Sequence, residues 1–141
     1  MNIKEIGMQD PLYDQTLALR TAVISAPFGF PAPEKGREEP DSHMFVAVDS
    51  GEVIGFAMIT PKNTSIHVRQ VCVWPARQKQ GIGQQLMQKA EQVAKKLGYD
   101  ELLLFAHTEA YPFYIKLKYL PRGDWMKAEN GLRTILMGKR L

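Results

Sequence analysis

The residues of this chain best suited to chemistry lie in the segment QKQGIG, residues 78–83, between an apolar strand-like run and an amphipathic helix-like run. The first N–H groups of a helix have no partner inside the helix and carry a partial positive charge. Gly81 and Gly83 have no side chain to keep a phosphate group from these N–H groups, and Arg77 and Lys79 add positive charge. The segment therefore predicts a phosphate or pyrophosphate site.

Two well-known phosphate-binding motifs do not fit this segment. A P-loop would need Lys followed by Ser or Thr after its last glycine, but Gly83 is followed by Gln84. A dinucleotide-binding fingerprint would need a third glycine where Leu86 stands. The pattern Q-x-x-G-x-G remains, and the alternative to a phosphate site is a glycine-rich helix start without a ligand.

Hydrophobic periodicity predicts the elements that position this segment. The most regular helix covers residues 81–97, and further helices are expected over residues 11–24, with Asp10 as N-cap, and over residues 110–118. Strands are expected over residues 2–8, 44–48, 53–60, 65–74, 101–107, 122–127 and 132–139. This order predicts an α+β fold, in which a mixed sheet of about seven strands carries helices on both faces.

The strand that precedes the segment changes phase. Its apolar residues stand at even positions in Ile66 and Val68 and at odd positions in Val71 and Val73. Such a one-residue slip is typical of a β-bulge, which bends a strand and frees backbone amides. A strand buried on both faces is the alternative, because Cys72 is also apolar.

A long loop is expected over residues 25–42, which contain four prolines and two glycines. Its Phe28 and Phe30, together with Trp74, either line an acceptor pocket or pack in the core. The sequence leaves both alternatives open.

Length and composition narrow the class of protein. A chain of 141 residues, 45% hydrophobic and 23% charged, suits one folded domain over residues 1–141. We expect no membrane-spanning segment, no secretory signal and, with Cys72 as the single cysteine, neither a disulfide nor a cysteine-based metal site, so a cytoplasmic protein is predicted. Residues 62–141 carry fourteen basic against six acidic residues but no basic tract, so neither nucleic acid nor membrane is an expected partner. A homodimer is compatible with the sequence.

Two segments of the chain resemble the GNAT acetyltransferase superfamily. The pattern V-x-V-x-P-x-x-Q-x-x-G-x-G-x-x-L-M, residues 71–87, is similar to that family's acetyl-CoA-binding motif. AYPFYIKLKY, residues 110–119, is similar to the family's A-x-x-F-Y-x-K-x-G-[FY] segment. Asp41-x-His43 and residues 110–114 also resemble the small ElaA-like branch. The resemblance covers essentially the whole chain and implies a GNAT-like sheet whose bulged central strand splays away from its neighbour.

The resemblance implies acetyl-CoA, and so coenzyme A, as cosubstrate. In the family, backbone groups of the bulged strand bind the pantetheine arm, and amides of the phosphate loop bind the pyrophosphate. On this basis the expected cosubstrate-binding residues are Val71, Cys72, Val73, Gln78, Lys79, Gln80, Gly81, Ile82, Gly83, Gln84 and Tyr114.

Direct attack of an amine on the thioester is also implied, without a covalent enzyme intermediate. Tyr114 matches the family tyrosine that protonates the departing thiolate, and the backbone N–H of Val73 is the natural donor to the oxyanion. An ammonium group must lose a proton before it can attack. The candidate bases are His67, His107 and Glu109, each of which is otherwise an ordinary strand-end residue.

The sequence departs from the family at the usual position of the base. Many relatives carry Glu two residues before V-x-V, where this chain has Arg69, which cannot accept a proton. Arg69 either binds an acidic group of the acceptor or forms a surface salt bridge. No motif places a partner beside Cys72, so we expect a buried cysteine rather than a nucleophile.

The leading hypothesis is an acetyl-CoA-dependent N-acetyltransferase that acts on a primary amine of a small molecule or peptide. The alternative is a non-catalytic CoA-binding or regulatory module of the same fold, which the missing strand carboxylate favours. A nucleic-acid-binding domain would need clustered Lys and Arg in a recognisable motif, and the sequence has neither.

Overall fold

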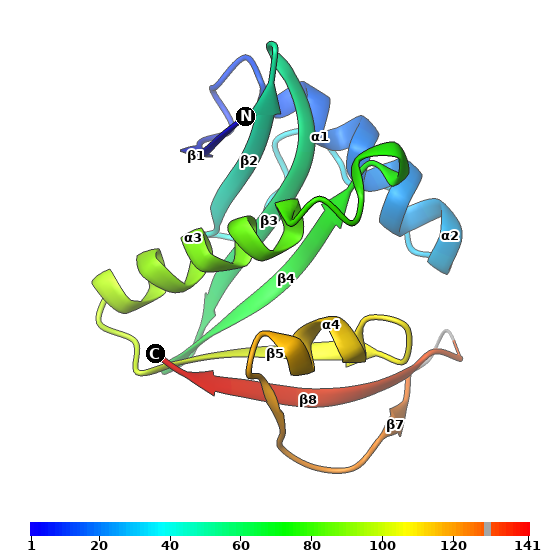
Figure 1. The fold of residues 1–141 in the computed structure, drawn as a ribbon, viewed down its shortest axis with the longest axis vertical. Coiled ribbons are helices and arrows are strands. Elements are labelled where there is room, and N and C mark those ends of the chain that lie inside the picture. The colour runs from blue at the N-terminus through cyan, green and yellow to red at the C-terminus, as the bar shows by residue number, and fades with distance from the viewer. Residues whose placement is uncertain (129–130) are drawn as a thin grey trace.

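One mixed eight-stranded sheet organises the computed structural model, which describes residues 1–128 and 131–141. Its strands are β1 (Asn2–Ile6), β2 (His43–Asp49), β3 (Glu52–Lys62), β4 (Ser65–Val73), β5 (Glu101–His107), β6 (Leu120–Pro121), β7 (Met126–Lys127) and β8 (Arg133–Arg140). The strand order is β1-β2-β3-β4-β5-β8-β6, and β7 also pairs with β8 (Figure 1). All pairs are antiparallel except β4–β5.

Helices cover both faces of this sheet. On one face lie α1 (Tyr13–Arg20), a π-helical turn (Thr21–Ser25) and α2 (Ala26–Phe28), and on the other lie α3 (Ile82–Lys96) and α4 (Tyr111–Lys116) (Figure 1). The apolar stripe of α3 packs into the larger core together with α4, whereas α1 packs on the opposite side of β2, β3 and β4. The predicted mixed sheet with helices on both faces is confirmed. No helix of the described residues is long and apolar enough to span a membrane.

The predicted bulge lies at Arg69. Met58 of β3 pairs with Gln70, and the next residue, Ile59, pairs with Val68, which leaves Arg69 as the extra residue of β4. A bulge changes which face of the sheet the following residues point to. The phase change seen in the sequence therefore has its structural cause at this position.

The two parallel strands β4 and β5 separate immediately after the bulge begins. They pair only where His67 meets Leu103 and Val68 meets Leu104, and beyond these positions they diverge (Figure 1). Backbone groups of a central strand normally pair on both sides. The last residues of β4 instead face an open fork, so the expected splay is confirmed.

The N-terminal helix and the loop after it differ from the prediction. α1 begins at Tyr13, and Asp10 is not its N-cap, because its Oδ1 accepts the N–H of Leu12 at 2.9 Å in a turn before the helix. The helical path continues through residues 21–28 and ends at Gly29, where φ is +72°. The loop consequently starts four residues later than expected.

The C-terminal region contains one strand more than predicted. β6 pairs with β8 at Gly138 and Met137. β7 is shorter than the predicted strand over residues 122–127, because Gly123, with φ of +155°, interrupts the extended chain. Residues 129 and 130, between the strands predicted over residues 122–127 and 132–139, lie outside the described residues.

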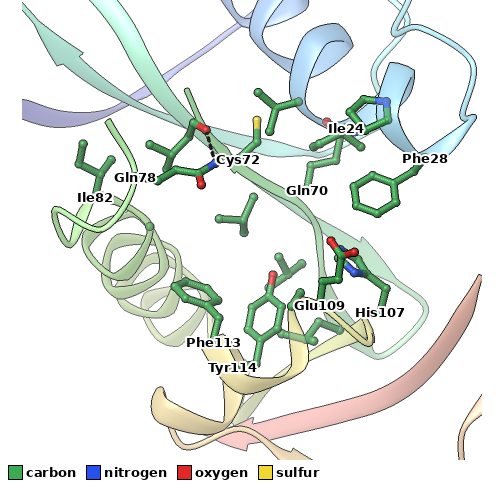
Figure 2. A pocket seen from close by; sticks show the side chains of 18 of the residues that line it. Ile24, Phe28, Gln70, Cys72, Gln78, Ile82, His107, Glu109, Phe113 and Tyr114 are labelled. Carbon is green, nitrogen blue, oxygen red and sulfur yellow. Dashed lines mark hydrogen bonds between the residues drawn. The ribbon is translucent and has the colours of Figure 1, made fainter. Parts of the chain in front are cut away.

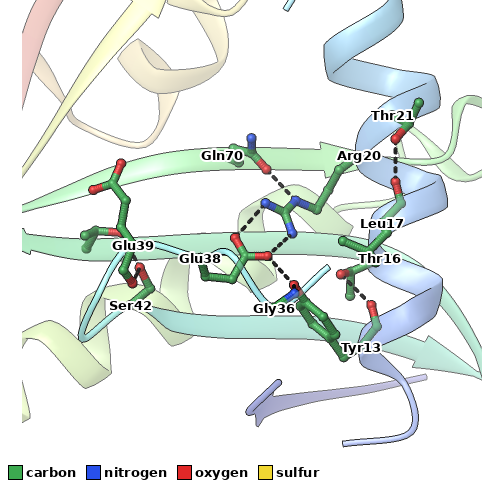
Figure 3. Close-up of polar contacts among 11 residues, drawn as sticks. Tyr13, Thr16, Leu17, Arg20, Thr21, Gly36, Glu38, Glu39, Ser42 and Gln70 are labelled. Atoms are coloured by element: carbon green, nitrogen blue, oxygen red, sulfur yellow. Dashed lines mark hydrogen bonds and ion pairs between the residues drawn. The ribbon is translucent and has the colours of Figure 1, made fainter. Parts of the chain in front are cut away.

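A buried ion pair ties the long loop to α1 (Figure 3). Arg20, only 2% exposed, donates to the two carboxylate oxygens of Glu38 at 2.8 and 2.9 Å, and the hydroxyl of Tyr13 donates to Glu38 at 2.6 Å. The Nε of Arg20 donates to Gln70, next to the bulge, at 2.7 Å. Burial acts to raise the pKa of Glu38, but the hydrogen bonds from Arg20 and Tyr13 and the charge of Arg20 hold it below its ordinary 4.5. One charged cluster therefore holds the loop, α1 and the bulge together.

Candidate active site

A cavity of about 1080 Å³ opens in the fork between β4 and β5. Its walls come from β4 beyond the bulge, the first turn of α3 with the loop before it, α2 with the turn before it, the end of β5, and α4 (Figure 2). Since α2 and α4 lie on opposite faces of the sheet, the cavity passes through the sheet at the fork. Two reactants can therefore meet inside it from opposite faces.

The end of β4 presents backbone groups to this cavity. The N–H of Trp74 donates to the carbonyl of Ile54, across to β3, at 3.0 Å. Successive residues of a strand direct their N–H groups to opposite sides, so the N–H of Val73 points away from β3 and toward the fork. The carbonyl oxygen of Val73, on the same side, accepts a 3.0 Å hydrogen bond from the side chain of Gln78 (Figure 2).

The loop before α3 leaves helix N–H groups uncovered. Gly81 is the N-cap residue, with φ of +79°, and no side chain caps the first turn. A Cβ at Gly83 would lie 3.2 Å from the ring of Phe113, so glycine there allows α4 to pack against α3. Gly81 is thus required by backbone conformation and Gly83 by helix packing, and neither hides the N–H groups that could bind an anion.

The positive charge around this loop is smaller than predicted. Arg77 forms an ion pair with Asp49, and its hydrogen bond and charge hold the pKa of Asp49 below the ordinary 3.8. Lys79 lines the cavity and has φ of +64°, whereas Gln80 does not line it. Anion binding at this loop would therefore depend on Lys79 and the backbone amides, because the charge of Arg77 is already paired.

Tyr114 directs its hydroxyl into the cavity from α4 (Figure 2). The ring is 8% exposed and packs edge-on against Phe113 and Tyr119, with centroid distances of 5.0 and 5.8 Å. Burial raises the pKa of Tyr114 above its ordinary 10.0, so the phenol keeps its proton at neutral pH. The hydroxyl has no hydrogen-bond partner among the described residues, which leaves it available to a ligand.

Glu109 and His107 line the same cavity near the end of β5. Figure 2 shows the carboxylate of Glu109 in front of the ring of His107. Burial lowers the pKa of His107 from its ordinary 6.5, and the negative charge of Glu109 acts in the opposite direction. His107 is therefore neutral at neutral pH and able to accept a proton.

The structure places Arg69, but not His67, among the residues that line the cavity. His67 does not line the cavity; it is buried, its ring stacks on Phe105 at 6.4 Å, and its Nε2 lies 3.2 Å from the hydroxyl of Ser65. Arg69 lines the cavity but forms a 3.0 Å ion pair with Glu39, which agrees with the salt-bridge alternative. The candidate bases inside the cavity are thus Glu109 and His107.

Cys72 is a buried thiol rather than a nucleophile. Its side chain belongs to the core on the α1 side, and burial raises its pKa to about 12. A thiol with this pKa is protonated at neutral pH, and the thiolate is the reactive form. The expected buried cysteine agrees with this environment.

The aromatic residues noted in the sequence divide between the cavity and the core, and further residues line the cavity without having been predicted. Phe28 and Phe30 line the cavity, so pocket lining holds for these two residues. Trp74 packs against the α1-side core, so core packing holds for Trp74. Gln70 and Phe113 also line the cavity. Their places depend on the splay of β4 from β5 and on the docking of α4, which no local pattern reveals.

Comparison with known proteins gives a family and a fold. Residues 13–119 match the family model described as the acetyltransferase (GNAT) family. An aminoglycoside 6′-N-acetyltransferase complexed with coenzyme A is similar over 99% of this chain and 97% of that chain, with 21% identity and a TM-score of 0.85. Aminoglycoside 6′-acetyltransferase type Ii is similar over 99% and 97%, with 27% identity and a TM-score of 0.83. ElaA from Escherichia coli is similar over 99% of both chains, with 18% identity and a TM-score of 0.81.

Proposed function

The chain belongs to the acetyltransferase (GNAT) family, and on this premise we propose that residues 1–141 form one domain that transfers an acetyl group from acetyl-CoA to a primary amine of a small molecule or peptide. The observation that carries the proposal is the open fork, where the end of β4 and the hydroxyl of Tyr114 face one cavity that extends to the first turn of α3. Its volume, about 1080 Å³, lies at the upper end for small-molecule sites and suits two substrates.

The residues at the α3 end of the cavity fit a coenzyme A thioester. The uncapped N–H groups from Gly81 onward would hold the pyrophosphate, with Lys79 adding charge. The backbone edge of residues 71–73 that faces the fork would pair with the amide groups of the pantetheine arm, as a strand pairs with a neighbour, although Gln78 already occupies the carbonyl of Val73. Gln80 does not line the cavity, so we leave it out of the proposed binding residues.

The reaction forms a bond between the amine nitrogen and the acetyl carbon and breaks the bond between that carbon and sulfur. The N–H of Val73 donates to the carbonyl oxygen while negative charge develops on it. Tyr114 gives its proton to the departing thiolate. The ammonium loses one proton to a base before attack. The nitrogen loses a second proton as the amide forms, and this proton restores the hydroxyl of Tyr114.

We assign the base to the pair of His107 and Glu109 rather than to His67. Both members of the pair line the cavity, whereas His67, whose ring stacks on Phe105, does not line it. The lowered pKa of His107 leaves its ring neutral and ready to take a proton from an ammonium group. Glu109 attracts that ammonium by charge.

Two measurements test the proposed function. Calorimetric titration with acetyl-CoA should give micromolar binding, and addition of a primary amine should then release free coenzyme A thiol. Binding without thiol release from any amine would instead indicate the non-catalytic module, which the replacement of the strand carboxylate by the ion-paired Arg69 favours. Absence of binding would overturn both functions.

A further inference from the structure

The α2 end of the cavity is lined by aromatic and aliphatic side chains. Ile24 precedes α2, Phe28 ends it and Phe30 follows it, and Phe105 and His107 face them from β5. The ring of Phe28 lies 4.6 Å from that of His107 and 6.4 Å from that of Phe30. Phe30 and Phe105 remain 44% and 48% exposed. Exposed apolar side chains gathered in one concave site are typical of a surface that binds an apolar group.

The charges that line the cavity limit how many positive charges an acceptor can carry. Among the described lining residues, Glu109 is the one acidic side chain. It is exposed and has no ion-pair partner in the described part of the chain, so its carboxylate is free to receive an ammonium group. The basic lining residues are Arg69, Arg77, Lys79 and Lys116. Arg69 and Arg77 are already ion-paired with Glu39 and Asp49. A polycation would therefore bring several ammonium groups to a site where one acidic lining side chain is available and Lys79 and Lys116 add positive charge.

From these two observations we infer that the acceptor is a monoamine with an aromatic or similarly apolar body. Its ammonium group lies at Glu109 and its apolar body lies against Phe28, Phe30 and Phe105. The inference rests on the proposed acetyltransferase function and names the class of acceptor. It also separates this chain from the aminoglycoside acetyltransferases that share its fold, whose named acceptors are polyamines.

A panel of three acceptors tests this class by thiol release from acetyl-CoA. 2-Phenylethylamine is the aromatic monoamine, spermidine the flexible polyamine and kanamycin the aminoglycoside. We expect kcat/KM for 2-phenylethylamine to exceed that for either polycation by about 10-fold or more. A polycation that matches or exceeds 2-phenylethylamine would overturn the inference and leave the acetyltransferase function intact.

Two variants test the apolar contact and the charge contact of the acceptor separately. Phe28→Ala should raise KM for 2-phenylethylamine about 10-fold by removing apolar contact, and Glu109→Gln should raise it by removing the charge partner. Leu97→Ala, which removes an exposed apolar side chain outside the cavity, is the matched control and should leave KM unchanged. Unchanged KM in both Phe28→Ala and Glu109→Gln would contradict the assignment.

A binding measurement separates failure of the inference from failure of the function. 2-Phenylethylamine is titrated into the wild-type protein saturated with coenzyme A and into its Phe28→Ala variant, each checked for folding by circular dichroism. Weaker binding to the variant supports the inference even without turnover. If coenzyme A binds and 2-phenylethylamine does not, the inference is wrong; if coenzyme A itself does not bind, the proposed function is wrong.

Discussion

The side-chain amide of Gln78 donates a 3.0 Å hydrogen bond to the carbonyl oxygen of Val73. This carbonyl lies at the fork, where β4 has lost β5 as a pairing partner, so the bond satisfies a backbone group that the splay would leave open. It also joins the loop before α3 to the strand that carries the proposed oxyanion donor. The glutamine three residues before Gly81 thus holds the two halves of the proposed thioester site in one geometry.

Replacing Tyr114 tests the proposed proton donor. Tyr114→Phe should lower kcat about 100-fold, because the ring keeps its packing while the proton is lost. Acetyl-CoA affinity, measured by calorimetry, should change little. Tyr111→Phe is the matched control, since Tyr111 packs on Trp125 at 5.3 Å outside the cavity, and its turnover should equal the wild-type value. Wild-type turnover in Tyr114→Phe would remove Tyr114 from the mechanism.

The two ends of α3 allow backbone strain to be separated from ligand binding. Gly81 and Gly98 have φ of +79° and +97°, so Gly81→Ala and Gly98→Ala should each destabilise the fold by about 1 kcal/mol. Only Gly81 lies at the proposed pyrophosphate site. Calorimetry should therefore show weaker acetyl-CoA binding for Gly81→Ala and wild-type affinity for Gly98→Ala. Equal affinities in the two variants would place the pyrophosphate elsewhere.

The ion pair between Arg20 and Glu38 should be far more important for stability than the exposed pairs. Glu38→Gln leaves a buried guanidinium without its counter-charge and should lower the free energy of unfolding by about 3 kcal/mol or more. Asp14→Asn removes the exposed partner of Lys35 and should cost less than about 1 kcal/mol. Urea unfolding measures both values, and similar losses would show that burial of the pair has little energetic effect.

The same carboxylate predicts how stability depends on pH. The folded-state pKa of Glu38 lies below 4.5, so folding favours its ionised form. Its contribution is complete above pH 4.5 and is lost as the pH falls through the folded-state pKa. Urea unfolding of the wild type and of Glu38→Gln at a series of pH values should therefore give a difference in free energy of unfolding that narrows as the pH falls below 4.5. A constant difference would contradict the assignment.

Cys72 should react slowly with thiol reagents in the folded protein. Burial and a pKa of about 12 keep the group as a thiol, whereas the thiolate is the attacking form. A colorimetric disulfide reagent should label the native protein much more slowly than the urea-unfolded protein. Rapid labelling of the native state would contradict this burial, since Cys72 lines the cavity but is only 5% exposed.

Much of the site follows from patterns that involve only neighbouring residues. The start of α3 after Gly81, the phase change beside Arg69 and the position of Tyr114 on a short helix are local features, because helix capping and strand alternation depend on residues a few positions apart. The family resemblance extends these local features to an order of elements. The fold class could therefore be predicted with its bulge and splay.

The remaining features depend on contacts between residues far apart in the sequence. Pairing of Arg77 with Asp49 removes a predicted cation from the loop, and the stacking of His67 on Phe105 takes a predicted base out of the cavity. The placing of Phe28 beside His107 likewise joins α2 to β5. Sequence alone determined which groups could do chemistry. Tertiary structure decided which of them share one cavity, because the divergence of β4 from β5 opens a single space that is lined by elements far apart in the sequence.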